Sequence, residues 1–179
     1  MSTPTLLTIS GALRAGSYNR QLIAQAVRAF GPATVTEADL NLPLYDGDLE
    51  AAQGIPASVQ TLADQIRQAD GIILSSPEYN KGIPGVLKNA LDWVSRIEGA
   101  VLKGKPLALM SAAAGRTGGE TAQYMVRACL APLQPRLIAG PFVMIAGAAR
   151  EFSAGQLEND QYLTAITAQM QALRAEIER

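Results

Sequence analysis

Apolar runs of strand length alternate with amphipathic stretches along the whole chain of 179 residues. The apolar runs predict strands because they are short and rich in β-forming residues. The run GIILSSP has no polar alternation, which is typical of a parallel strand buried on both faces. The second run is weaker than the others, and Gly140 and Pro141 break the fifth. The five strands are predicted at residues 5–10, 33–40, 71–77, 105–113 and 136–146.

The amphipathic stretches between these runs predict helices, because apolar residues recur in them at helical spacing. Residues 41–56, rich in Pro, Gly and Asp, predict a long loop. Successive βα units indicate an α/β fold with helices packed on a central parallel sheet. No linker or internal repeat interrupts the pattern, so residues 1–179 are predicted to form one domain. The helices are predicted at residues 19–30, 57–70, 84–96, 118–133 and 160–179.

Ligands of such sheets bind beyond the carboxyl ends of the strands, which draws attention to three loops. The first, GALRAGSYNR, opens a helix and carries Gly16, Ser17 and Asn19 with one cation, Arg14. A helix N-terminus attracts anions, and this set of donors suits a single phosphate monoester. The Lys-Ser/Thr pair of a nucleoside triphosphate loop is missing. An ordinary turn with Ser17 or Asn19 as the helix cap explains the same residues.

The other two loops suit a flat ligand. The loop SSPEYNKGIPG, residues 75–85, holds Tyr79, on which a planar ring could stack, and Asn80, which could hydrogen-bond to it. The loop MSAAAGRTGGE, residues 110–120, has small residues and three glycines, which leave room beside the backbone. A solvated turn explains either loop alone. Their convergence with the first loop at one end of the sheet favours a ligand.

Composition narrows the chemistry. The chain has no histidine, which excludes a Ser-His-Asp triad and His-based metal sites, so no metal is predicted. A formal net charge of -1 without a basic cluster argues against nucleic acid as a partner. No apolar run approaches the roughly 20 residues of a membrane span, and the start of the chain lacks a basic region and a cleavage site. We therefore expect a cytoplasmic protein without membrane insertion, whose reactivity comes from a cofactor.

Four segments resemble, in order, the signature segments of the NAD(P)H-dependent FMN reductase family, and especially its bacterial quinone and chromate reductases. They are SGALRAGSYNRQL, LPLYDGDLE, PEYNKGIPGVLKNALDWVSR and GRTGGETAQY. The resemblance implies a flavodoxin-like three-layer sandwich with a five-stranded parallel sheet in the order 2-1-3-4-5. It also implies bound FMN, NAD(P)H as co-substrate, a small-molecule electron acceptor, and a homodimer with the flavin close to the subunit interface. A tetramer is left open.

The resemblance also assigns residues to the flavin. The loop from Ala12 to Asn19 would hold the phosphate, mainly through Arg14, Ser17 and Asn19, and the other two loops would line the isoalloxazine ring. The family usually has Ser at position 12 and commonly Arg at position 121, where this chain has Ala12 and Thr121. The implied cofactor-binding residues are Ala12, Leu13, Arg14, Ser17, Tyr18, Asn19, Pro77, Glu78, Tyr79, Asn80, Lys81, Ser111 and Ala113.

The implied reaction is a ping-pong transfer of hydride from NAD(P)H, by way of flavin N5, to quinones or to acceptors such as chromate, azo or ferric compounds. No side chain stands out as catalytic; Glu78, Tyr79 and Arg96 are the candidates, and water, Tyr79 or Glu78 would supply protons. Arg96 and the segment 42–50 would border the substrate pocket or the dimer contact. The preference between NADH and NADPH is not evident from the residues.

Three alternatives stay open: a reductase that releases reduced FMN to a partner, a flavodoxin-type electron carrier, and a non-enzymatic signalling domain. The carrier is disfavoured because a net charge of -1 gives little electrostatic steering to a partner. Arg14 also stands in a loop where carriers rely on neutral donors. The signalling domain would require all three loops to be without a ligand.

Overall fold

Six parallel strands form the centre of the computed structural model, which describes residues 3–153 and 155–179. The strands are β1 (Thr5–Ser10), β2 (Thr34–Glu37), β3 (Gly71–Ser75), β4 (Pro106–Ala112), β5 (Arg136–Leu137) and β6 (Val143–Ile145). Their order is β2-β1-β3-β4-β5, and β6 also pairs with β4. The predicted order 2-1-3-4-5 is therefore confirmed, with the fifth strand divided in two.

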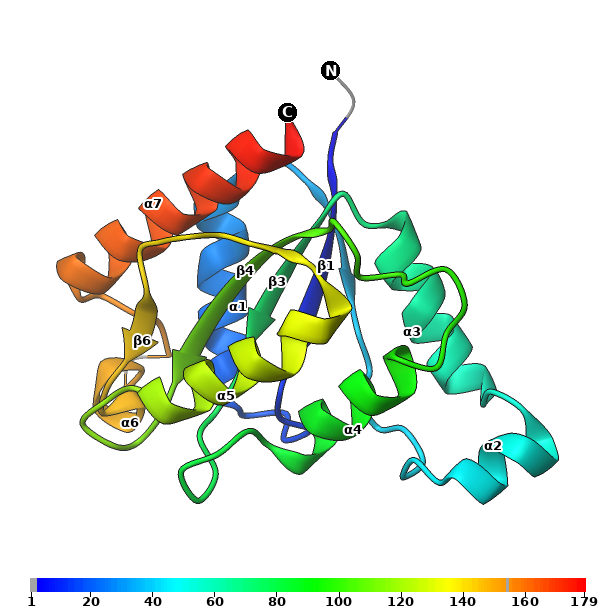
Figure 1. Cartoon of the computed structure of the whole chain (residues 1–179). Helices are drawn as coiled ribbons and strands as arrows, with labels where there is room; N and C mark the ends of the chain where they lie inside the picture. Colours follow the sequence, from blue (N-terminus) through cyan, green and yellow to red (C-terminus); the bar gives the residue numbers. More distant parts are fainter. Residues whose placement is uncertain (1–2, 154) are drawn as a thin grey trace.

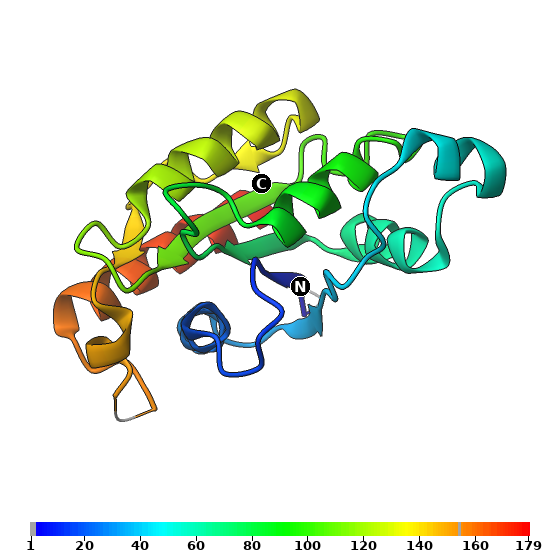
Figure 2. The same ribbon diagram turned by 90° about the horizontal axis from the view of Figure 1, so that it is seen from below.

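Helices cover both faces of the sheet and give the three layers of the predicted sandwich (Figure 1). They are α1 (Tyr18–Phe30), α2 (Gly47–Gln53), α3 (Ala57–Gln68), α4 (Gly85–Val94), α5 (Glu120–Leu130), α6 (Ala148–Glu151) and α7 (Asp160–Ile177), with a 3-10 turn η1 (Ala131–Leu133). α3, α4 and α5 pack on one face, and α1, α6 and α7 on the other. Figure 2 shows α4 and α5 on the opposite side of the sheet from α1. Within the described ranges, no helix has the length and apolar character needed to cross a bilayer.

Side chains of the strands pack into two separate hydrophobic cores, one on each face of the sheet. In β4, Leu107 and Leu109 point into the core under α3, α4 and α5, whereas Ala108 and Met110 point into the core under α1 and α7. Successive side chains of a strand face opposite sides of the sheet, so both sets are buried. This explains why the central strands lack polar alternation in the sequence.

The fifth strand is interrupted between β5 and β6, at the Gly140–Pro141 break expected from the sequence. Two buried glutamines supply hydrogen bonds there from opposite faces of the sheet. Gln123 of α5 donates to the carbonyl of Val143 at 2.8 Å, and Gln169 of α7 donates to the carbonyls of Leu109 at 3.1 Å and Pro141 at 3.0 Å. Buried carbonyl groups that lack a strand partner are thereby satisfied.

The segment 41–56 is not only a loop, because it contains the helix α2. The Asp46 side chain accepts a hydrogen bond from the Asp48 N–H at 2.9 Å and so caps the start of this helix. Gly54, with φ of 75°, follows its end. The Asp and Gly residues that suggested a loop are thus the caps of a seven-residue helix. The sequence prediction also missed the short helix α6, which follows β6.

Residues 43–45 dock this segment onto α4. The Trp93 indole N–H donates to the carbonyl of Pro43 at 2.8 Å, and the Asn89 amide donates to the same carbonyl at 3.0 Å. The Asn89 side-chain oxygen accepts from the Tyr45 N–H at 2.8 Å, and the Tyr45 ring meets the Trp93 ring edge-on at 5.0 Å. Because α2 has no buried residue, these contacts hold the segment in place together with the Arg96–Glu50 ion pair and the packing of Leu42 and Ile55 against the core.

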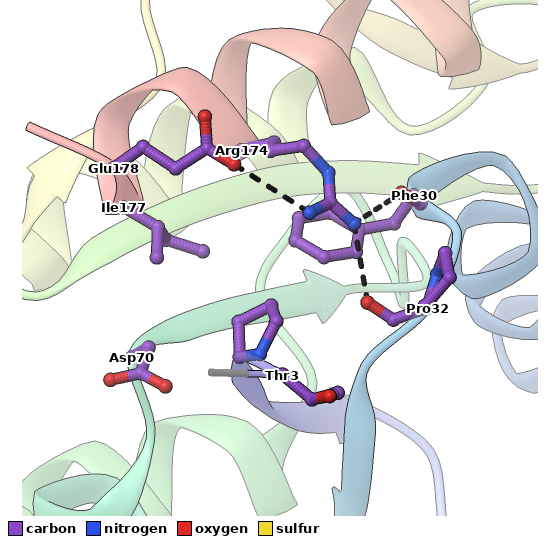
Figure 3. Close-up of a pocket in the computed structure, with 8 residues that line it drawn as sticks. Thr3, Phe30, Pro32, Asp70, Arg174, Ile177 and Glu178 are labelled. Atoms are coloured by element: carbon purple, nitrogen blue, oxygen red, sulfur yellow. Dashed lines mark hydrogen bonds and ion pairs between the residues drawn. The ribbon is translucent and has the colours of Figure 1, made fainter. Parts of the chain in front are cut away.

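A hollow of about 620 Å³ lies at the other edge of the sheet, where the strands begin (Figure 3). Arg174 of α7 crosses it, with its guanidinium 4.2 Å from the centre of the Phe30 ring. The same guanidinium donates to the carbonyls of Phe30 at 2.8 Å and Pro32 at 3.2 Å, which caps the end of α1. The Asp70 carboxylate accepts from the Thr5 N–H at 2.8 Å. These polar groups serve the fold, so we do not treat the hollow as a functional site.

Candidate functional site

The loops after β1, β3 and β4 meet at the edge of the sheet where these strands end, which Figure 2 views from below. The Gly11 N–H donates to the carbonyl of Ser75 at 2.8 Å, and the Ser76 N–H donates to that of Met110 at 3.0 Å. A Cβ atom on Gly11 would lie 3.1 Å from the Pro77 ring, so the first two loops are in direct contact. The predicted convergence of the three loops is confirmed.

The first loop carries several main-chain N–H groups that have no hydrogen-bond partner within the described part of the chain. Among the described residues, the main-chain N–H groups of residues 13–16 and of Tyr18 have no hydrogen-bond partner. Arg14 is exposed, and its guanidinium lies 5.7 Å from the centre of the Tyr18 ring. The Ser17 hydroxyl accepts from the Asn19 N–H at 3.2 Å and caps α1, which leaves its own hydrogen free to donate. The arrangement suits an anion with several oxygens.

Two other residues of this loop face inward. Ala12 is buried, its N–H donates to the Ser10 hydroxyl at 3.4 Å and its carbonyl accepts from the same hydroxyl at 3.2 Å, so it offers a ligand no unpaired donor. Asn19 is buried beneath the loop, and its side chain bonds to Ser75 and Ala112. This geometry gives no support to the expectation that the Asn19 side chain is a main phosphate contact.

The second loop is a tight hairpin. Tyr79 and Gly82 exchange two main-chain hydrogen bonds of 3.2 and 3.0 Å, and the two residues between them, Asn80 and Lys81, have φ of 50° and 62°. Two positive φ values in a two-residue loop are the pattern of a type I′ turn. The turn exposes Tyr79, Asn80 and Lys81 at the rim, whereas Pro77 is buried at its base.

Replacing Lys81 by glycine should stabilise the protein by about 0.5–1 kcal/mol, because a side chain is strained at positive φ. The ion pair that would be lost, 3.4 Å between Lys81 and Glu78, has a lysine side chain that is 75% exposed and adds little. Thermal unfolding measures the effect. Asn80→Gly is the matched control and should gain less, because asparagine tolerates this conformation better. A Lys81→Gly variant that unfolds below the wild type would contradict the assignment of strain.

Glu78 is turned away from the rim. One of its carboxylate oxygens accepts from the Ala122 N–H at 3.2 Å, in the first turn of α5, and the side chain is 10% exposed. A carboxylate at this position satisfies a free N–H group and the positive end of the helix dipole. The expected role of Glu78 as a proton source is therefore not favoured. Its carboxylate ties the hairpin to α5.

The third loop is held from below by Ser111 and Gln123. The Ser111 hydroxyl donates to the carbonyl of Gly118 at 2.6 Å and accepts from the Gln123 amide at 3.0 Å. Ser111 has no exposed surface, so its side chain supports the loop. That the turn from Ser111 to Ala113 lines the flavin ring stays a prediction. Ala113 is half-buried, and its N–H donates to the carbonyl of Ile145 at 3.1 Å.

A fourth loop, residues 146–152, completes the edge and was missed from the sequence. The Gly147 N–H donates to the carbonyl of Gly115 at 3.1 Å, and the Phe152 ring stacks on that of Tyr18 at 5.9 Å. It therefore touches both the first and the third loop. Topology could have predicted it. The loop that follows any further parallel strand begins at the same edge of the sheet.

Arg96 lies away from the four loops. It follows the C-terminal end of α4, roughly 16 Å along the helix axis from Gly85, the residue at which α4 leaves this edge. Its guanidinium bonds to the Glu50 carboxylate at 3.0 Å, which raises the pKa of Arg96. Partial burial and a hydrogen bond to Glu50 raise the pKa of Tyr45. Arg96 therefore does not lie beside the three loops of its own chain; that it borders the substrate pocket or the dimer contact stays a prediction.

Comparison with known proteins shows the family of this chain. Residues 4–150 match the family described as NADPH-dependent FMN reductase, and the chain is 41% identical over 177 residues to an NAD(P)H-dependent FMN reductase of Pseudomonas aeruginosa, covering 97% of this chain and 95% of that one. The chain belongs to the NADPH-dependent FMN reductase family. It is also 38% identical over 158 residues to a quinone reductase of Escherichia coli K12, covering 86% and 79% of the two chains. Its structure matches FerB, a flavoenzyme NAD(P)H:(acceptor) oxidoreductase from Paracoccus denitrificans, with a TM-score of 0.86, 29% identity and 98% of both chains covered.

As a member of the NADPH-dependent FMN reductase family, the protein is an oxidoreductase that uses FMN and NAD(P)H. The donors at this edge fit FMN. Arg14 and the unused N–H groups of residues 13–16 match a phosphate dianion. The main-chain N–H groups of Glu78, Asn80 and Lys81 also have no partner within the described part of the chain, and they suit the oxygen and nitrogen acceptors of a flavin ring.

Proposed function

We propose that this FMN reductase transfers hydride from NAD(P)H to quinones in a ping-pong cycle at the edge where β1, β3 and β4 end. The observation that carries the proposal is the openness of the rim, where the Tyr79 side chain is 53% exposed above buried strand ends. Nicotinamides and quinones are both flat, so each can stack at one open position in turn. The names of the quinone reductase from E. coli and of FerB support a quinone or a similar small acceptor.

The residues of this chain bind and orient the cofactor and the substrates. FMN, when bound, supplies the centre that accepts and donates hydride. Arg14, Ser17 and the free N–H groups of the first loop hold the phosphate. The N–H groups of Glu78, Asn80 and Lys81 hydrogen-bond to the ring and favour added negative charge on it. Protons for the acceptor come from water or from the Tyr79 hydroxyl, because the Glu78 carboxylate is bonded to α5. A cytoplasmic location, expected from the sequence, agrees with NAD(P)H as the reductant.

Initial rates test the cycle. With NADPH or NADH varied at several fixed concentrations of benzoquinone, double-reciprocal plots should be parallel; intersecting lines would contradict ping-pong transfer. The purified protein should stay yellow through desalting, and loss of colour would favour the release of reduced FMN to a partner. The same assay with chromate, azo dyes and ferric chelates ranks the acceptors by their rates of reduction. Turnover of NAD(P)H without any preference for quinones would overturn the proposed substrate class.

Replacing Arg14 by alanine should weaken FMN binding by about 10- to 100-fold, because a charge-assisted hydrogen bond to the phosphate is lost. Titration of FMN into the FMN-free protein, followed by quenching of flavin fluorescence, measures the dissociation constant. Arg116→Ala is the matched control, since Arg116 is an exposed arginine in the third loop. It should change the constant by less than about threefold. Equal affinities for the two variants would remove Arg14 from the phosphate site.

We further propose a homodimer formed through the side of the molecule covered by α4 and α5. Large apolar side chains are exposed there: Leu44 at 80%, Tyr124 at 57% and Met125 at 41%. Apolar surface of this kind marks a contact with another protein, and the resemblance to the family implies a second copy. Light scattering on the eluting protein should give twice the chain mass of 18.9 kDa. A monomer would refute the dimer, and four chains would extend the assembly to a tetramer.

A further inference from the structure

Asn19 connects the ends of β3 and β4 at the edge of the sheet where the four loops lie. It follows the cap of α1, and its side-chain oxygen accepts from the Ser75 hydroxyl at 2.7 Å and from the Ala112 N–H at 3.0 Å. Its side-chain amide donates to the carbonyl of Ala112 at 2.9 Å. One side chain of the first loop thus joins the last residue of β3 and the last residue of β4.

These bonds take up almost all of the hydrogen-bonding capacity of the Asn19 side-chain amide. The oxygen of Asn19 holds two donors, one N–H of its side chain is bonded, and the residue is 2% exposed. Its main-chain N–H donates to the Ser17 hydroxyl at 3.2 Å. A buried amide satisfied on both of its polar atoms resists displacement, because each broken bond would leave a partner unsatisfied.

We propose that Asn19 is a positioning residue, which fixes the two loops that line the flavin ring relative to each other without touching the phosphate. Ser17 and Arg14 bind the phosphate from the same loop, and Ser75 and Ala112 precede the two ring loops. Asn19 fixes these two ring loops relative to each other through bonds that do not depend on the ligand. The proposal rests on the FMN site proposed above.

A comparison of FMN with riboflavin, which has the same ring and no phosphate, separates positioning from phosphate binding. In the FMN-free protein, Asn19→Ala and the near-isosteric Asn19→Asp should weaken FMN and riboflavin by the same factor, about tenfold or more. The aspartate keeps the acceptor for Ser75 and Ala112 but loses the donor to the Ala112 carbonyl. Arg14→Ala is the contrast, because it should weaken FMN alone and so lower the ratio of the two affinities. Visible circular dichroism of bound FMN should change in both Asn19 variants and stay as in the wild type for Arg14→Ala, since only the former shift the ring loops.

The outcomes are distinct. Loss of FMN affinity with riboflavin binding unchanged would make Asn19 a phosphate ligand and overturn the proposal, as would wild-type affinity for both flavins. A wild-type protein that binds neither flavin would instead overturn the proposed function. Thermal unfolding without flavin shows that each variant is folded, and Asn19→Asp serves where Asn19→Ala does not fold.

Discussion

Replacing Gly118 by alanine should lower the free energy of unfolding by about 2–5 kcal/mol and weaken FMN binding at the same time. Gly118 has φ of 63°, and a Cβ atom there would lie 2.6 Å from the carbonyl carbon and 2.7 Å from the oxygen of Met144. Both are main-chain atoms of β6, which cannot turn aside as a flexible side chain can. Relief of the clash requires the loop to move, which breaks the 2.6 Å bond between Ser111 and the Gly118 carbonyl.

Gly115→Ala is the control for this prediction. Gly115 belongs to the same loop, yet no heavy atom lies within 4 Å of the position of its Cβ. Its stability should stay within about 0.5 kcal/mol of the wild type. Thermal unfolding of the two variants should therefore differ by about 5–15 °C, from the usual shift per kcal/mol in a protein of this size. Equal melting temperatures would show that the loop can move to accommodate the Cβ atom without loss of stability. The fixed shape of the loop would then not be required for stability.

Replacing Trp93 by alanine should cost about 3–5 kcal/mol. The indole has no exposed surface, meets the Tyr45 ring edge-on at 5.0 Å and donates to the carbonyl of Pro43 at 2.8 Å. Its removal leaves a cavity under α4 and frees the segment that carries α2. Urea denaturation measures the stability, and limited proteolysis should reveal new cleavage within residues 41–56.

Trp93→Phe separates the two parts of this effect. Phenylalanine keeps most of the buried ring and loses only the bond to Pro43, whose carbonyl still accepts from Asn89 at 3.0 Å. A cost of about 1–2 kcal/mol is expected, with the segment still protected from protease. If Trp93→Ala stayed within 1 kcal/mol of the wild type, the segment would be held by other contacts. Because Leu44 and Tyr45 belong to it, Trp93→Ala should also weaken the proposed dimer.

The layers of the fold were predictable because hydrophobic periodicity reports burial directly. A helix with helically spaced apolar residues was expected at residues 57–70, and Val59, Leu62 and Ile66 are buried in α3. Pro84 was expected at the start of a helix and is the cap of α4. The convergence of the loops followed from topology alone, since parallel strands end at one edge of the sheet. Short helices were not predictable in this way, because α2 and α6 are too short to show a period and lie among turn residues.

The roles of individual residues at the site were harder to predict. In a loop, no sequence pattern shows whether a polar side chain points into the protein or toward solvent. Asn19, Glu78 and Ser111 have the chemistry of ligand contacts, and the structure turns all three toward the protein. Each one satisfies main-chain groups at a strand end or a helix start, a need that depends on neighbours distant in sequence. Arg14 and Tyr79 are exposed at the rim, where long or apolar side chains remain available to a ligand.

The interruption between β5 and β6 gives the chain a place for added residues. The hydrogen bonds around it come from Gln123 and Gln169, so the ladder does not depend on an unbroken strand there. A longer excursion after Ile138 would emerge at the side of the sheet, where the entropy cost of lengthening a loop rises only slowly. This makes the break a natural point for grafting a tag or a partner-binding peptide without disturbing the flavin.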